Sequence, residues 1–133
     1  DWRVMDRDAY FIVPEVKLGM NLQWNTVPRL VTLVGPARAK RITLLCEKIW
    51  AQDIFDWGLV DRLADKKGQS LELALEWAEI VASFDPLTVR MVKEAITVTA
   101  SATDRGLSFA DADQSMLGSS LNAALRVIPV QGV

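Results

Sequence analysis

One carboxylate is enclosed between an apolar run and a glycine within the first twenty residues of the chain. Phe11-Ile-Val-Pro14 has the composition of a short strand, Glu15 follows it directly, and Gly19 permits a turn four residues later. A side chain in this position is held by a rigid element while it points toward a cavity, and its apolar neighbours partly shield it from water. The pattern therefore favours Glu15 as a proton carrier. The alternative is an exposed Glu that caps the following turn.

The composition excludes several classes of function. The chain has 133 residues, half of them hydrophobic, and a net charge of -2, which is typical of one domain able to bury a core. Its 15 basic and 17 acidic residues are spread along the chain, so no nucleic-acid partner is expected. No apolar run reaches the roughly 20 residues that span a bilayer, so no membrane partner and a cytoplasmic location are expected. Histidine is absent, which removes Ser-His and His-metal chemistry, and the single Cys46 reads as a small core residue in mid-helix.

The pattern predicts short strands first and helices afterwards. Residues 2–13 read as one or two short strands, and everything after about residue 26 reads as helix. Pro36 begins a helical turn after Gly35, and Gly58 ends a brief helix that starts at residue 51. Ser70 is expected to cap the next helix and Asp85-Pro86 to start another, while a final helix is expected over 107–117. Two apolar stripes are predicted, Leu71, Leu75, Ala78 and Ala82 on one helix and Leu87, Met91, Ala95 and Val98 on the next.

Five blocks of sequence, in order and with matching spacing, resemble the crotonase (enoyl-CoA hydratase/isomerase) superfamily. They are Ala9-Tyr-Phe11-Ile-Val-Pro14-Glu15 with Gly19 and Pro28-Arg-Leu30; Val34-Gly35 with Ala39 and Leu44-Leu45; Ile49-Trp-Ala51 with Gly58-Leu-Val60; Asp85-Pro86 with Val89, Lys93 and Ala95; and Asp104-Arg-Gly106-Leu107. The resemblance runs over nearly all of the chain. Each block is weak alone, and their joint order makes the signal specific.

The resemblance implies an α/β fold, a spiral of ββα turns followed by a C-terminal helical layer. This chain would be mainly α with a few short strands, with residues 1–68 forming the end of the spiral core and 69–133 the helical region that builds trimers or hexamers. The implied activity is that of a lyase or isomerase, acid-base chemistry next to an acyl-CoA thioester through an oxyanion-stabilised enolate. Coenzyme A carries the substrate, and no separate cofactor and no metal are implied.

The family's oxyanion donors, and the second glutamate of its hydratases, lie in its front half. The chain therefore resembles the C-terminal half of such an enzyme, and we expect it to be inactive alone and to require the missing N-terminal half. The residues do not choose between hydration, isomerisation and C-C cleavage, and they do not define the acyl chain.

The resemblance assigns Glu15 as the catalytic residue and Pro14, Gln23 and Trp24 as substrate-binding residues. Many hydratases carry a glycine-rich loop where this chain reads Asn21-Leu-Gln-Trp-Asn-Thr26. Trp24 would narrow a pocket there, and ordinary core packing is its alternative role. The basic C-terminal element that reaches the CoA phosphates in many members is not visible after Leu121, so a substrate other than a CoA ester stays open.

Two other functions stay open from the residues. A non-catalytic crotonase-fold module would only assemble oligomers. An unrelated helical domain would use Trp24, Trp50, Trp57 and Trp77 to line a partner groove, with Trp50 and Trp57 on one face. The acidic residues Asp1, Asp6 and Asp8, which could suggest a metal cluster, read instead as a solvated strand edge beside arginines.

Overall fold

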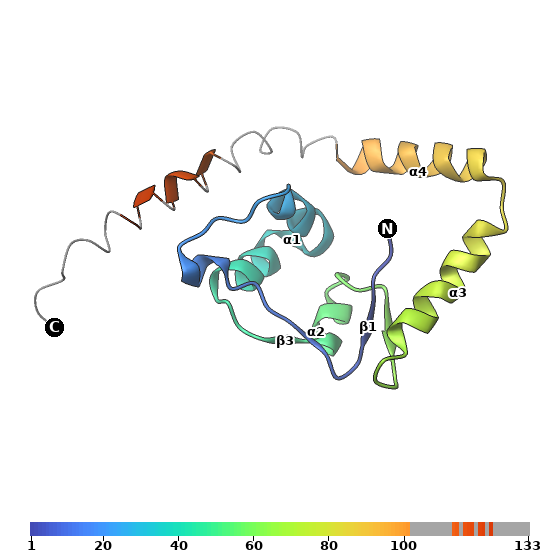
Figure 1. The fold of residues 1–133 in the computed structure, drawn as a ribbon, viewed down its shortest axis with the longest axis horizontal. Helices are drawn as coiled ribbons and strands as arrows, with labels where there is room; N and C mark the ends of the chain where they lie inside the picture. The colour runs from blue at the N-terminus through green and yellow to red at the C-terminus, as the bar shows by residue number, and fades with distance from the viewer. Residues whose placement is uncertain (102–112, 115, 119, 122, 124–133) are drawn as a thin grey trace, which may run out of the picture.

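The computed structural model describes residues 1–101, 113–114, 116–118, 120–121 and 123 (Figure 1). Its elements are β1 (Val4–Asp6), β2 (Tyr10–Phe11), the 3₁₀ turn η1 (Glu15–Leu18), α1 (Thr26–Leu44), β3 (Ile49–Trp50), α2 (Ala51–Asp56), β4 (Arg62–Ala64), α3 (Ser70–Ala82) and α4 (Pro86–Ala100). The described part is mainly helical with a few short strands, as predicted. The start of the helix expected over 107–117, the block from Asp104 and most of the tail lie outside the described residues.

Four short strands form two separate pairs. β1 pairs in parallel with β4, and β2 pairs antiparallel with β3. The strands expected within residues 2–13 are confirmed, whereas the prediction of helix throughout the later part is wrong at β3 and β4. Two or three residues are too few to display an alternating pattern, and these segments become strands because an earlier part of the chain supplies their backbone partners.

Glycines divide the helical part as the sequence predicts. Gly35 interrupts α1 with φ 79° and ψ 162°, a conformation that essentially only glycine adopts, and Pro36 begins the second half of the helix. Gly58, at φ 80°, follows the end of α2 and accepts the left-handed conformation expected of it. These breaks allow α1 and α2 to fold back over the same core.

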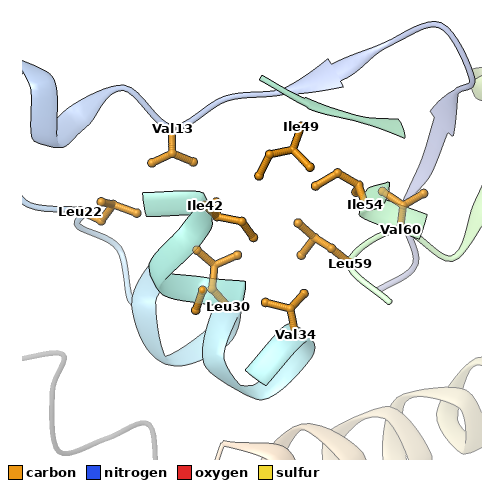
Figure 2. Packing of buried hydrophobic residues seen from close by; sticks show 10 residues of the cluster. Val13, Leu22, Leu30, Val34, Ile42, Ile49, Ile54, Leu59 and Val60 are labelled. Atoms are coloured by element: carbon orange, nitrogen blue, oxygen red, sulfur yellow. The ribbon is translucent and has the colours of Figure 1, made fainter. Parts of the chain in front are cut away.

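The core lies between α1, α2 and the β2-β3 pair. Figure 2 shows its side chains converging from these elements, and the full cluster is Val13, Leu22, Leu30, Val34, Ala39, Ile42, Ile49, Ile54, Leu59 and Val60. Cys46 is buried, as predicted, but it lies beyond the end of α1 with φ 50° and not in mid-helix. The chain between Val13 and Leu22 leaves this core and returns to it, and that excursion carries Glu15.

The start of α3 is held by a residue from β1. Ser70 does not cap the helix, because the capping position is Gln69 and no side chain of its own bonds there. Instead, the Asp6 carboxylate accepts the backbone N–H groups of Gly68 at 2.6 Å and Ser70 at 2.9 Å. The expected start of α4 is confirmed, since Asp85 accepts the N–H of Thr88 at 2.8 Å and Pro86 opens the helix.

The predicted apolar stripes on α3 and α4 face outward. Leu71 and Leu75 on α3, and Leu87 and Met91 on α4, are exposed. The inner side of α3 carries Leu73, which is buried. In Figure 1, α4 turns back from the far end of α3 and lies above the core, apart from it. The periodicity therefore identified apolar faces correctly, but Leu71, Leu75, Leu87 and Met91 remain exposed among the described residues.

The Asp6 contact predicts a specific dependence of stability on pH. The N–H of Gly68, with Ser70, holds the pKa of the Asp6 carboxyl below its ordinary value of 3.8, against the opposing effect of desolvation. A lowered pKa means that the stabilisation is present above pH 3.8 and is lost as the pH falls below it. Asp6→Asn should therefore lower the free energy of unfolding at pH 7, with a difference from the unaltered chain that shrinks below pH 4. Urea denaturation at several pH values measures it.

The exposed Asp8 provides the control. Asp8→Asn should leave the pH dependence of unfolding unchanged. Equal pH profiles for the two variants would contradict the role of Asp6 at the start of α3.

Candidate active site

Glu15 occupies the first position of a tight turn next to the core. The strand β2 ends at Phe11, earlier than the sequence suggested, and buried Val13 then anchors the chain before η1 begins. Gly19 closes the turn in the left-handed conformation, with φ 71°. The predicted glycine turn is confirmed, but Glu15 projects from a 3₁₀ turn and not from the end of a strand.

Hydrogen bonds hold this turn on both sides of Glu15. The N–H of Lys17 donates to the carbonyl of Pro14 at 3.0 Å, and the N–H of Met20 donates to the carbonyl of Glu15 at 3.0 Å. The Lys17 ammonium also donates to the carbonyl of Cys46 at 3.3 Å, which ties η1 to the end of α1. The backbone that carries the carboxylate is thus positioned by contacts from two parts of the chain.

The carboxylate of Glu15 is partly withdrawn from water. The residue is half-buried, its Oε2 atom is shielded from solvent, and within the described part of the chain Oε2 accepts no hydrogen bond. This differs from the exposed, turn-capping Glu of the alternative interpretation. Leaving a shielded acceptor without a donor costs about 1–3 kcal/mol, so the position suits a carboxylate whose partner is a reacting group.

The residues predicted to bind substrate lie on both sides of this turn. Pro14 is exposed and directly precedes Glu15, while Gln23 and Trp24 follow buried Leu22 in the loop before α1. Trp24 is 89% exposed and has φ 60°, so the core-packing alternative for its indole is wrong. Two successive left-handed residues, Trp24 and Asn25, turn the chain into α1 and leave the indole outside the core.

A contact that the sequence did not indicate joins the loop to the C-terminal part of the chain. The Asn21 amide donates to Oε1 of Gln114 at 2.9 Å, and Gly118 approaches the carbonyl of Gly19. Because 93 residues separate Asn21 from Gln114, no local motif marks the pair.

Several charged side chains near the core have partners within the fold. Arg38 and Arg41, both on α1, place their guanidinium groups 5.6 and 5.3 Å from the centre of the Trp57 ring, so they pack partly on an aromatic face. Asp1 pairs with the Lys93 ammonium at 2.6 Å.

The four tryptophans proposed for a partner groove have separate surroundings. Trp50 lies on β3 against Tyr10 and not on a helix face with Trp57, and Trp77 packs edge-on against Trp2 at 5.4 Å.

Among the described helices, none has the length and apolar character needed to cross a membrane.

The chain is similar in sequence to known proteins of one family. The family model for enoyl-CoA hydratase/isomerase matches residues 1–126. The mevalonyl-coenzyme A hydratase SIDH of Beauveria bassiana is 32% identical over 88 residues, which are 66% of this chain and 31% of that protein. The protein named probable enoyl-CoA hydratase echA6 of Mycobacterium leprae is 33% identical over 96 residues, 72% of this chain and 37% of that protein.

A solved structure shares the fold. The enoyl-CoA hydratase EchA16_2 of Mycobacterium paratuberculosis superposes with a TM-score of 0.83 and 20% identity, over 93% of this chain and 55% of that one. In both curated relatives the matched part is less than half of the protein.

Proposed function

The chain belongs to the enoyl-CoA hydratase/isomerase family, and on this premise we propose that it takes part in acid-base chemistry on an acyl-CoA thioester. The fold is the crotonase fold. Membership of the family overturns the alternative of an unrelated helical interaction domain. The choice between enzyme and assembly module then depends on the site around Glu15.

We infer that the chain corresponds to the C-terminal half of the family's enzymes. The blocks it resembles come from the later part of the family pattern, and its match covers only about a third of each curated relative. The oxyanion donors would then come from a front half, and the chain alone would lack turnover. The division at residues 68 and 69 between spiral core and helical region is part of the same proposal.

The observation that carries the function is the shielded Oε2 atom of Glu15, which has no hydrogen-bond donor among the described residues. In hydration, the oxygen of water bonds to C3 of the enoyl group while one proton of that water passes to a carboxylate. The electron pair of the C2–C3 double bond moves transiently to the thioester oxygen, and it returns to C2 as a proton is delivered there. In isomerisation, a proton leaves one carbon of the acyl chain and is returned to another. Both reactions need a carboxylate that holds or releases a proton beside the acyl carbons.

Glu15 is the residue that we assign to this proton transfer. Exposed Pro14 and Trp24, with Gln23, would contact the acyl group on either side of the carboxylate. The indole of Trp24 is open to solvent and rigid, so it offers an apolar face to a chain or ring. No metal and no separate cofactor enter the proposed steps.

The outward stripes on α3 and α4 support an assembled protein. Leu71, Leu87 and Met91 are each more than 60% exposed, which is costly for a chain that remains alone in water. We propose that copies of the protein cover these faces in a trimer or hexamer. The same stripes favour the second candidate, a module that assembles without catalysis.

Turnover distinguishes the two candidates. A full-length protein that contains this chain should hydrate or isomerise an enoyl-CoA, measured as loss of the conjugated thioester absorbance, while the 133-residue chain alone should show none. A full-length protein that forms the oligomer and leaves the enoyl-CoA unchanged would favour the assembly module. Turnover by the isolated chain would contradict the need for a front half.

A further inference from the structure

The loop that carries Glu15 has few apolar anchors of its own. Between buried Val13 and Leu22, the side chains of Val16, Leu18 and Met20 are 40–56% exposed. The loop is therefore held mainly by polar contacts, and segments of this kind open locally more readily than the core does.

Two contacts place the described C-terminal residues Gln114 and Gly118 against this loop, and both residues are helical. The Asn21 Nδ2 group donates to Oε1 of Gln114 at 2.9 Å, while Asn21 Oδ1 accepts the N–H of Leu22 at 2.9 Å. One asparagine thus joins the loop to itself and to the segment. Four residues after Gln114, one helical turn further on, a Cβ atom at Gly118 would lie 3.5 Å from the carbonyl oxygen of Gly19.

The contact at Gly118 limits what the segment can carry. A Cβ at 3.5 Å is in ordinary van der Waals contact, so alanine fits there. A larger side chain at the same position would meet the Gly19 backbone and push the segment from the loop. The space beside Gly19 therefore suits glycine or alanine at position 118.

We propose that Gln114 and Gly118 are positioning residues, which hold the Glu15 loop in place through Asn21 and Gly19. Gln114 and Gly118 would then be part of the active site's framework although they contribute no reacting group. The consequence for catalysis depends on the proposed function of Glu15, but the positioning itself is measurable without turnover.

Amide hydrogen exchange on the 133-residue chain tests the contact. The N–H groups of Gly19 and Met20 donate to the carbonyls of Val16 and Glu15, so their exchange reports opening of the loop. Gln114→Leu removes the acceptor and should speed exchange at both amides about fivefold, which corresponds to about 1 kcal/mol. Gln114→Glu keeps an oxygen acceptor and adds charge, so exchange should be unchanged or slower.

Matched variants separate this role from a general loss of stability. Gly118→Ala should leave exchange at Gly19 unchanged, whereas Gly118→Leu should speed it. Asp113→Asn, an exposed neighbour of Gln114, should have no effect. The N–H of Leu59, which bonds to Ile54 in the core, should keep its rate in every variant.

The proposal is overturned if Gln114→Leu and Gln114→Glu act alike, or if Leu59 and Gly19 speed up together. In the full-length protein, Gln114→Leu should lower kcat. Gln114→Glu, which keeps an oxygen acceptor, should leave kcat close to that of the unaltered protein. If Glu15→Gln leaves turnover intact while the exchange pattern holds, the proposed function fails and the positioning contact stands.

Discussion

Glu15→Gln is expected to lower the turnover of a full-length protein containing this chain by a factor of about 10² to 10⁴, the usual contribution of a positioned acid or base. Glutamine has nearly the shape of glutamate, so the side chain keeps its place in η1, but it cannot carry the proton. The measurement is steady-state turnover of an enoyl-CoA over a range of pH.

The same variant should not destabilise the fold. Oε2 of Glu15 is shielded and accepts no hydrogen bond within the described residues, so the amide breaks no hydrogen bond of that atom there. The free energy of unfolding should therefore stay the same or rise. Loss of turnover without loss of stability is the pattern expected of a residue kept for chemistry.

Glu72→Gln is the control for this experiment. Glu72 is exposed in the first turn of α3, far along the chain from η1, and its replacement should leave turnover unchanged. If Glu15→Gln retained full turnover, Glu15 would have no part in the mechanism.

Residues that start or end helices by their own backbone preferences made much of the fold predictable. Gly35, Gly58 and Asp85-Pro86 each impose a backbone geometry by their own chemistry, and each acts in the structure as the sequence indicates. The family blocks predicted the fold class because their order and spacing are long-range information in themselves.

The features that escaped prediction all depend on residues distant in sequence. The strands β3 and β4 exist through pairing with β2 and β1. The start of α3 uses Asp6, more than sixty residues earlier, in place of Ser70. Periodicity identifies an apolar face but does not say what covers it, and Leu71 and Leu75 on α3 and Leu87 and Met91 on α4 are exposed in this structure.

In the candidate site, too, features set by neighbouring residues were predictable and contacts between distant residues were not. Glu15 and its glycine turn were visible because they are adjacent in sequence, and their assigned role stays a prediction. The contact from Gln114 to Asn21 was invisible, since nothing near either residue marks the other. Trp24 was misjudged as a possible core residue because its positive φ, which turns the indole outward, is not readable from the residue type.

Ile42→Ala should cause the largest loss of stability among single changes in the core. Ile42 is 1% exposed and lies in the second half of α1, at the centre of the cluster in Figure 2. Truncation leaves a cavity and is expected to cost about 2–5 kcal/mol, against about 0.5–1.5 kcal/mol for Ile42→Val. Since domains of this size are stable by about 5–15 kcal/mol in total, the alanine variant should show a much lower urea midpoint.

Leu44, two residues later on the same helix, gives the matched control. It is 58% exposed, so Leu44→Ala should change the free energy of unfolding by about 0.5 kcal/mol or less. Similar losses for the two alanine variants would mean that the cluster around Ile42 does not hold the fold together. Because Val13 and Leu22 belong to that cluster and bracket the Glu15 loop, the site would then lack the rigid base on which its chemistry depends.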